Sequence, residues 1–342
     1  MNDHRLTLLQ RWLEDELGFS DYRLTPASGD ASFRRYFRVT RESGSKIVMD
    51  APPDKEDIAP FLHVASLLGA LDLNVPAVLA EDRAQGFLLL SDLGSRTYLE
   101  ALEGGANFEA LYADALGSLV RMQSMDAAAA GSLPPYDAAL LAREMGLFRD
   151  WLCERHLGFS LVGSQAEALE QTFAFLSDAA LEQPRVFVHR DYHSRNLMQT
   201  EARNPGILDF QDAVHGPVTY DLISLLRDCY VAWPAGRVRE WALDYRERAA
   251  ACEIPVGHDA AGFLRWFDLM GVQRHLKAAG IFARLKHRDG KPGYLADVPR
   301  TLGYVVAVAA GYPELAFLGE LVATRVLPAL ATGMRDVSAC GR

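Results

Sequence analysis

The hydrophobic pattern of this chain changes its period early in the sequence, and that change limits the folds it can adopt. Leucines recur at helical spacing from Leu6 to Leu17, behind Asn2 or Asp3 as a cap, and predict a first helix. Runs rich in Phe, Val, Leu and Ile follow and favour strands over 33–40, 46–51, 77–80 and 86–90. A helix over 54–71, followed by Pro76, interrupts them. We expect a small antiparallel sheet with one inserted helix.

Helical spacing dominates from Arg96 onward. It predicts helices over 108–127, 137–157, 164–182, 219–232, 237–252, 260–285 and 297–330. Short strands are expected only over 185–188, 197–200 and 206–208. A chain of 342 residues is long for one core, so we predict an α+β protein with two lobes. A sheet lobe over residues 1–92 and a helical lobe over 93–342 would join at a hinge over 91–94.

Composition and charge exclude several classes of function. Apolar residues make up 49% and charged residues 23%, which is typical of globular proteins. The net charge of −10 argues against a nucleic-acid partner, which requires a basic face. The four cysteines form no C-x-x-C pair, and no uninterrupted apolar run reaches the ~18 residues of a membrane span. The acidic, amphipathic N-terminus is unlike a signal peptide, so we expect a cytoplasmic protein without a membrane partner.

One stretch, VFVHRDYHSRNLM over residues 186–198, places ionisable side chains directly after a buried strand. Asp191 is followed by Asn196 and then by Asp209, and this order and spacing is typical of a phosphoryl-transfer site. One carboxylate would accept the proton of an attacking hydroxyl. The Asn amide oxygen and the second carboxylate would hold Mg²⁺, which prefers oxygen ligands and nucleotide phosphates. The alternative for Asp191 is a turn aspartate that bonds its own backbone.

The motif HRDYHSRN followed by LDF resembles the catalytic loop and metal-binding Asp of the protein-kinase-like superfamily. The run ILDFQDAVHGPVTYD over 207–221 is similar to the aminoglycoside phosphotransferase/choline kinase family, although His215-Gly-Pro217 replaces an Asp that often precedes the Pro. The resemblance implies a bilobal fold, ATP and Mg²⁺ as cofactors, and Asp221 as a brace below the catalytic loop. His189 would pack in the core and support the loop.

Three further segments, over 28–38, 86–94 and 273–284, resemble bacterial cell-wall-recycling sugar kinases. Those enzymes phosphorylate the anomeric hydroxyl of N-acetylmuramate and N-acetylglucosamine, so the resemblance implies a small amino sugar and Mg-ATP as binding partners. Small residues around Gly29 would let backbone N–H groups approach phosphate, the alternative being a plain hairpin turn. The residues expected to bind nucleotide are Ser28, Gly29, Asp30, Ser32, Arg34, Leu90, Ser91 and Asp92.

The third strand of the expected sheet departs from the kinase pattern. Related kinases carry a lysine there that pairs with the α- and β-phosphates. Here the strand reads KIVMD, and if Val48 faces adenine, its same-face neighbour is Asp50 rather than a lysine. No lysine is therefore assigned to the phosphates, and the cation could come from Arg34 or Arg35.

The acceptor pocket is expected to be formed by residues near the helix that begins at Asp221 and by the basic helix over 260–285. The candidates are Arg227, Asp228, Tyr230, Trp233, Arg274 and Lys277. Arg274, Lys277 and Arg284 fall near one face at helical period, which also fits a solvated basic surface. The functional interpretation is that one arginine pairs with the lactyl carboxylate of N-acetylmuramate.

Three alternatives to this sugar kinase remain open from the sequence. A kinase of the same fold could act on an aminoglycoside or an amino alcohol, although a cationic acceptor favours an acidic pocket. A metal-dependent hydrolase could use His189, Asp191, His193 and Asp209. A kinase-fold binding protein without activity is the third, favoured by the absent lysine and opposed by the intact Asp/Asn/Asp set.

Overall fold

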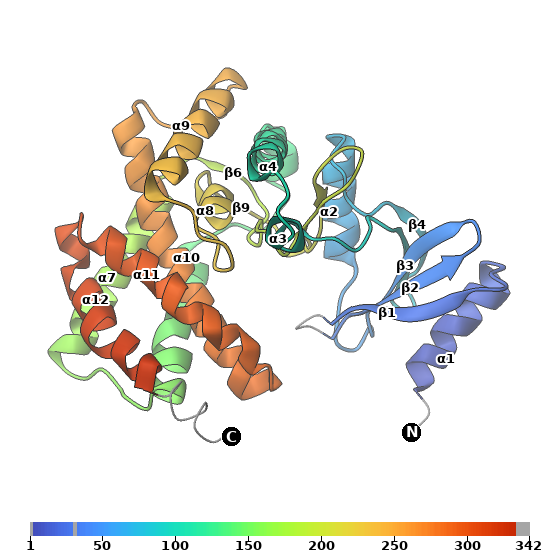
Figure 1. Ribbon diagram of the computed structural model, residues 1–342, viewed down its shortest axis with the longest axis horizontal. Coiled ribbons are helices and arrows are strands. Elements are labelled where there is room, and N and C mark those ends of the chain that lie inside the picture. Colours follow the sequence, from blue (N-terminus) through green and yellow to red (C-terminus); the bar gives the residue numbers. More distant parts are fainter. Residues whose placement is uncertain (1–2, 30–32, 333–342) are drawn as a thin grey trace. The chain divides into compact units, whose positions relative to one another are not determined.

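A computed structural model describes residues 3–29 and 33–332 of the chain (Figure 1). The described residues form two compact units, and the chain passes between them more than once. The first unit contains the residues up to Asn107 together with Asn196–Asp212. The second contains Phe108–Arg195 together with the residues from Ala213 onward. The lobe boundary after residue 92 was placed at the expected hinge over 91–94, and it remains a prediction.

The first unit is built on an antiparallel sheet in the strand order β1-β2-β3-β5-β4. Its strands are β1 (Arg23–Gly29), β2 (Arg35–Arg41), β3 (Gly44–Asp50), β4 (Val78–Asp82) and β5 (Phe87–Ser91). The predicted antiparallel sheet is confirmed. Strand β1 was not predicted, because Pro26, Ser28 and Gly29 are turn-type residues that hide its alternation, and its register shifts between Pro26 and Ser28.

Helix α1 (His4–Arg11) and its π-helical continuation η1 (Trp12–Glu16) cover one face of this sheet (Figure 1). The Asp3 carboxylate caps α1 by accepting a hydrogen bond from the Leu6 N–H at 3.1 Å. The buried cluster between helix and sheet contains Leu9, Trp12, Leu13, Val39, Val48, Phe87 and Leu89. Burial of each such side chain stabilises the fold by roughly 1.5–3 kcal/mol, so α1 is an integral part of the unit.

The inserted helix α2 (Ala59–Ala70) begins five residues later than the sequence predicted. Pro60 stands in its first turn, and the Asp57 carboxylate accepts a hydrogen bond from the Ala59 N–H at 2.8 Å, which fixes the start. Phe61 on this helix packs against Phe210, with ring centroids 4.9 Å apart. Helix α3 (Tyr98–Glu103) follows β5 and begins with a capping box formed by Thr97 and Glu100.

A short hairpin far along the sequence completes the first unit. Its strands are β7 (Leu197–Met198) and β8 (Gly206–Ile207), paired antiparallel. The Ile207 N–H donates to the Asn74 carbonyl at 2.8 Å, and the Gln199 N–H donates to the Arg96 carbonyl at 2.9 Å. These backbone bonds attach residues 196–212 to the segment between α2 and α3.

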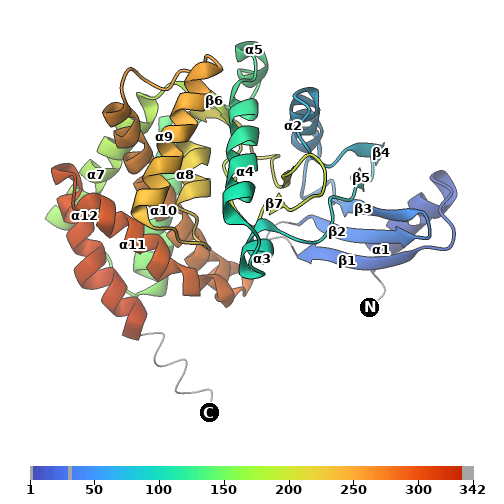
Figure 2. The same ribbon diagram turned by 45° about the horizontal axis from the view of Figure 1, so that its top comes forward.

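The second unit is helical and is organised around α10 (Ala260–Asp289), which contacts most of the other helices (Figure 2). The remaining helices are α4 (Phe108–Gln123), α5 (Ala127–Ala130), α6 (Ala138–Leu147), η2 (Phe148–His156), α7 (Ser164–Leu181), α8 (Tyr220–Leu226), α9 (Ala235–Ala251), η3 (Pro292–Asp297), α11 (Val298–Ala309), η4 (Pro313–Leu315), α12 (Ala316–Leu321) and η5 (Val322–Val326). Strand β6 (Arg185–Val188) pairs antiparallel with β9 (Val214–Pro217). The predicted α+β class, with a sheet lobe and a larger helical lobe, is confirmed.

Two segments of the second unit differ from the sequence prediction. Strand β9 was missed because its sequence, VHGP, contains Gly216 and Pro217, which signal a turn. The helix predicted over 219–232 ends at Leu226, where the chain turns into a loop over 227–234.

In the part of the chain that the structure describes, Pro313–Thr332 is long and apolar enough to cross a membrane by length and composition, which is weak evidence for a span.

Candidate active site

Strand β6 ends at Val188, and the polar loop of the HRDYHSRN motif begins there. The Asp221 carboxylate, fully buried in the first turn of α8, accepts hydrogen bonds from the backbone N–H groups of His189 at 2.6 Å and Arg190 at 2.9 Å. Arg190 has a positive φ of 76°, a conformation that non-glycine residues adopt rarely. The two hydrogen bonds therefore hold a tight turn immediately before Asp191.

A second buried carboxylate holds the far side of the same loop. Asp228 accepts hydrogen bonds from the N–H groups of Ser194 and Tyr230, both at 2.9 Å, and its side chain is fully buried. The sequence analysis expected Asp228 to bind sugar, but the structure uses both carboxylate oxygens to fix the backbone. Asp228 lay inside the helix predicted over 219–232, so the sequence carried no signal of this loop-supporting role.

The Asp191 carboxyl lies in a strongly positive field. Burial alone would raise its pKa, but the charges of Lys277, His193, Arg190 and Arg274 outweigh burial and lower the pKa to about 2. The backbone N–H of Asp191 donates to His189 Nδ1 at 3.3 Å, which makes that nitrogen an acceptor. Asp191 is thus held as a carboxylate, the form that can accept a proton.

A buried polar network that the sequence analysis did not anticipate surrounds Glu144 on α6. Glu144 forms an ion pair with Arg190 and a second with Lys277, whose Nζ lies 3.2 Å from Glu144 Oε1. Lys277 also donates to the Tyr220 hydroxyl at 2.9 Å. Lys277 was expected in the acceptor pocket, and the structure commits its ammonium to Glu144 and Tyr220. A glutamate on the apolar face of a predicted helix was the only signal.

The other acceptor candidates lie in the second unit with distinct surroundings. Arg227 pairs with Asp268 at 2.6 Å, and Trp233 donates its indole N–H to the Tyr112 hydroxyl at 2.7 Å. Tyr230 lies under the Arg195 guanidinium, whose carbon is 4.0 Å from the ring centroid. Arg227 and Trp233 are therefore engaged by protein groups, and the Tyr230 ring, in the loop over 227–234, packs against Arg195 and His193 of the catalytic loop.

The hairpin of the first unit brings together the other two members of the motif. Asn196 precedes β7 and Asp209 follows β8, and the Leu208 N–H donates to the Asn196 carbonyl at 2.9 Å. The Asn196 side-chain amide lies 3.3 Å from Asp209 Oδ2. Asp209 has a positive φ of 64°, so the chain turns sharply at this carboxylate. An amide and a carboxylate this close supply oxygen ligands of the kind Mg²⁺ prefers, and the pair fits that ion.

The expected nucleotide-binding residues of the first unit come from the segments over 28–34 and 90–92. Asp30 and Ser32 lie outside the described residues, while the backbone of Ser28 and Gly29 ends β1 opposite β2. Arg34 comes just before β2. Leu90 and Ser91 belong to β5, where Leu90 is buried and the Ser91 hydroxyl accepts from the Ala77 N–H at 2.8 Å.

The hinge residue Asp92 is held by an arginine of the sheet. Arg38 on β2 donates to both Asp92 carboxylate oxygens, at 2.6 Å from Nε and 3.0 Å from Nη2, and to the Gly94 carbonyl at 2.7 Å. Burial alone would raise the pKa of Asp92, but the hydrogen bonds from Arg38, Ser45 and Gly94 outweigh it and lower the pKa. Such a two-pronged pair fixes the path of the chain over Asp92–Gly94.

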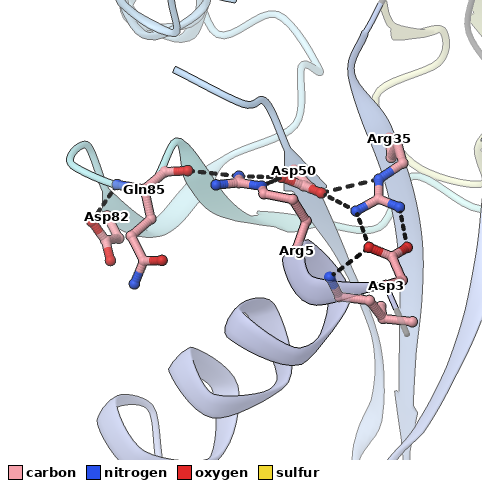
Figure 3. Close-up of polar contacts among 7 residues, drawn as sticks. Asp3, Arg5, Arg35, Asp50, Asp82 and Gln85 are labelled. Carbon is pink, nitrogen blue, oxygen red and sulfur yellow. Dashed lines mark hydrogen bonds and ion pairs between the residues drawn. The ribbon is translucent and has the colours of Figure 1, made fainter. Parts of the chain in front are cut away.

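The end of β3 carries a charge cluster in place of the family lysine (Figure 3). Asp50, fully buried, accepts hydrogen bonds from Arg5 Nε at 3.0 Å and from Arg35 Nε at 3.0 Å. Arg35 also pairs with Asp3, and Arg5 donates to the Gln85 carbonyl at 2.7 Å. Arg35 is therefore bound to two carboxylates of its own unit.

The conditional placement of Val48 against adenine was wrong. Val48 is fully buried in the cluster beneath α1 and η1, and Asp50 shares its face of the strand. The helix that covers this face was predicted, but not where it packs. The opposite face of β3 carries Ile47 and Met49, so neither face of the strand has a lysine between Ile47 and Asp50.

The metal-dependent hydrolase gains no support from the geometry. Within residues 3–29 and 33–332, no three His, Cys, Asp or Glu side chains gather as a metal site. His193, in the catalytic loop, packs against Tyr230 with ring centroids 5.4 Å apart, and burial lowers its pKa.

Comparison with known proteins is consistent with this arrangement. Residues 23–264 match the model of the phosphotransferase enzyme family. The chain is 50% identical over 333 residues to an N-acetylmuramate/N-acetylglucosamine kinase of Pseudomonas aeruginosa, which covers 94% of this chain and 97% of the relative. A choline kinase from Streptococcus pneumoniae has a TM-score of 0.62 at 12% identity, covering 91% of this chain and 100% of that structure. An ADP-bound aminoglycoside phosphotransferase has a TM-score of 0.56 at 17% identity, covering 89% and 98%. This chain belongs to the phosphotransferase enzyme family.

Proposed function

We propose that this protein transfers the γ-phosphoryl group of ATP to the anomeric hydroxyl of N-acetylmuramate and N-acetylglucosamine. The observation that carries the proposal is the 50% identity over 94% of the chain to a kinase named for these two sugars. The buried Arg274 guanidinium supports it, because its charge acts at Asp191 and would repel a cationic aminoglycoside or amino alcohol acceptor.

Asp191 is the proposed general base. Its carboxylate accepts the proton of the 1-hydroxyl as the oxygen attacks phosphorus. The hemiacetal 1-hydroxyl is more acidic than an ordinary alcohol, so a carboxylate with a depressed pKa is an adequate acceptor. Asp221 and Asp228 act through the backbone, because each holds two N–H groups on or beside the loop that carries Asp191. Transfer is direct and forms no covalent enzyme intermediate.

Asn196 and Asp209 are the proposed ligands of Mg²⁺. When bound, the ion offsets the negative charge of the nucleotide phosphates during transfer. Asn196 would present its amide oxygen to the ion, while its amide nitrogen donates to Asp209 Oδ2 at 3.3 Å. Gln211 donates to Asp209 Oδ1 at 2.7 Å and so orients that carboxylate for its role.

The segments that the sequence analysis assigned to nucleotide binding are retained in this proposal. The N–H groups around Gly29 approach the phosphates, and the chain over Leu90–Asp92 faces the adenine. Arg38 acts as a positioning residue, since it fixes Asp92 and Gly94. Because β3 has no lysine for the phosphates, the proposed positive charges there are the metal ion and Arg34. Arg35 is held by Asp3 and Asp50.

The proposed setting is the bacterial cytoplasm, where the enzyme would return amino sugars released from the cell wall to metabolism. A panel of acceptors tests the substrate class. ADP release is measured with Mg-ATP and N-acetylmuramate, N-acetylglucosamine, kanamycin or choline, each at the same concentration. The proposal predicts turnover with both amino sugars and none above the acceptor-free rate with the other two. Turnover only with kanamycin or choline would show that the protein is a kinase whose acceptor is not an amino sugar of this kind.

A further inference from the structure

Arg274 is a buried cation whose charge no carboxylate neutralises directly. It lies in the middle of α10 and its exposed fraction is 4%. Among the described residues it forms no ion pair, and its one hydrogen bond runs from Nη1 to Cys229 Sγ at 3.6 Å. Sulfur is a weak acceptor, and Arg274 Nε is buried without any partner. A guanidinium in this state has lost its water without gaining full replacement, which is costly.

The other buried cations near the catalytic loop are paired. Lys277, one turn further along α10, lies 3.2 Å from Glu144, and Arg190 pairs with the same carboxylate. Arg227, which is less deeply buried, pairs with Asp268 at 2.6 Å. Of the two buried cations on α10, Lys277 is therefore paired with a carboxylate and Arg274 is not.

The position of Arg274 relates it to the proposed base. The charges of Asp191 and Asp228 both act on Arg274, yet neither lies close enough to form an ion pair with it. Arg274 Nη1 donates to Cys229, whereas Nε, on the edge of the guanidinium that it shares with Nη2, is buried without an acceptor among the described residues. That edge is the two-donor fork that a carboxylate matches with parallel hydrogen bonds.

We propose that Arg274 binds the carboxylate of an acidic sugar acceptor and thereby determines how well N-acetylmuramate competes with N-acetylglucosamine. This inference rests on the proposed function. The two sugars differ by the lactyl ether of N-acetylmuramate, whose carboxylate is the only charge on either molecule. Arg274 singles itself out from the three basic residues of α10 considered from the sequence, because Lys277 is already paired and Arg284 is only half-buried.

The test pairs a change in the protein with the matching change in the ligand. Wild type and Arg274→Met are each assayed with N-acetylmuramate, with its primary amide, which lacks the charge, and with N-acetylglucosamine. Methionine keeps the length of the side chain and removes its charge. We expect kcat/KM for N-acetylmuramate to fall about 30-fold or more, as for a buried charge that loses its partner. At pH 7 we expect N-acetylglucosamine and the amide to change less than about 3-fold, because Lys277 and Arg190 still keep Asp191 ionised when the Arg274 charge is lost.

A matched control and the opposite outcomes make the test decisive. Arg265→Met removes the same charge from the exposed start of α10, where Arg265 pairs with Glu182, and should leave all three substrates unchanged. An equal loss with all three substrates in Arg274→Met would overturn the inference and make Arg274 a support of Asp191. No loss with any of them would overturn it as well. If wild type phosphorylates neither sugar, the proposed function itself fails, which is a separate and visible result.

Discussion

At the scale of single residues, the account rests on charges that the fold has removed from water. Asp191 is ionised because Lys277, His193, Arg190 and Arg274 outweigh the effect of its burial and hold its pKa at about 2. Glu144, itself kept ionised by Lys277 and Arg190 against its burial, with its pKa at about 2, holds two of those cations in place. The ionisation of Asp191 therefore depends on Glu144, which holds two of the cations around it.

The pH dependence of turnover follows from this network. Because Asp191 acts as a base only when ionised, and its pKa is depressed, the acidic limb of kcat/KM should lie well below pH 4 in wild type. Lys277 contributes most to lowering the pKa of Asp191, so the acidic limb should move to higher pH in Lys277→Met. Lys286→Met, a charge loss on the same helix, is the control. A limb that stays in place in Lys277→Met would contradict this electrostatic account.

The two proposed roles of the carboxylates separate in a binding experiment. Asp191→Ala should lower kcat by about a thousandfold or more while Mg-ATP binding, followed by calorimetry, stays near wild type. Asp209→Ala should lose the Mg²⁺-dependent part of nucleotide binding as well as turnover. Normal turnover in Asp191→Ala would show that another group is the base.

At the scale of elements, close packing positions both halves of the motif. The β7–β8 hairpin sets Asn196 beside Asp209, and the α8 start with its loop holds the backbone around Asp191. Helix α1 has a comparable role on the sheet, where Arg5 and Arg35 converge on Asp50 (Figure 3).

The charge cluster at Asp50 should matter for stability. Asp50→Ala leaves Arg5 and Arg35 without their shared partner, and we expect a loss of about 2–3 kcal/mol in the free energy of unfolding. Glu81→Ala removes an exposed pair with Arg83 on the same sheet and should cost less than about 0.5 kcal/mol. Urea denaturation of both variants tests this, and equal losses would show that burial of Asp50 has no special weight.

The contact between α10 and the end of α6 has a matched pair of glycines for its test. A Cβ on Gly280 would lie 2.3 Å from the Leu147 carbonyl carbon, whereas a Cβ on Gly303 in α11 meets no atom within 4 Å. Gly280→Ala should therefore destabilise the protein by about 2 kcal/mol or more. Gly303→Ala should stabilise it by about 0.5–1 kcal/mol, because alanine favours the helix. Thermal unfolding measures both, and a stable Gly280→Ala would contradict the tight packing.

The sequence predicted elements where their own pattern was strong and missed them where packing decides. The first helix, the sheet strands β2, β3 and β5, and the long basic helix all carry clear periods. Strands β1 and β9 do not, because Pro26, Gly29, Gly216 and Pro217 imitate turns. The motif around Asp191 could be found from spacing alone, whereas Glu144 and Asp50 could not, because their partners lie far away in the sequence.

At the scale of the whole molecule, the chain divides a single sequence motif between its two compact units. Asp191 belongs to the helical unit, and Asn196 and Asp209 belong to the unit with the sheet. The division falls between Arg195 and Asn196, within the motif itself. Side chains on helices α6, α8 and α10 thus support the proposed base, and a hairpin attached to the sheet unit carries the proposed metal ligands.

Transfer of phosphate to the anomeric hydroxyl of an amino sugar leaves a product that phosphorus NMR can identify. The reaction is followed with Mg-ATP and N-acetylmuramate, and in parallel with N-acetylglucosamine. We predict a new phosphate resonance coupled to the anomeric proton, formed in step with ADP and absent with Asp191→Ala. A product whose phosphorus couples to the C6 protons, or ATP that stays unconsumed with both sugars, would contradict the account.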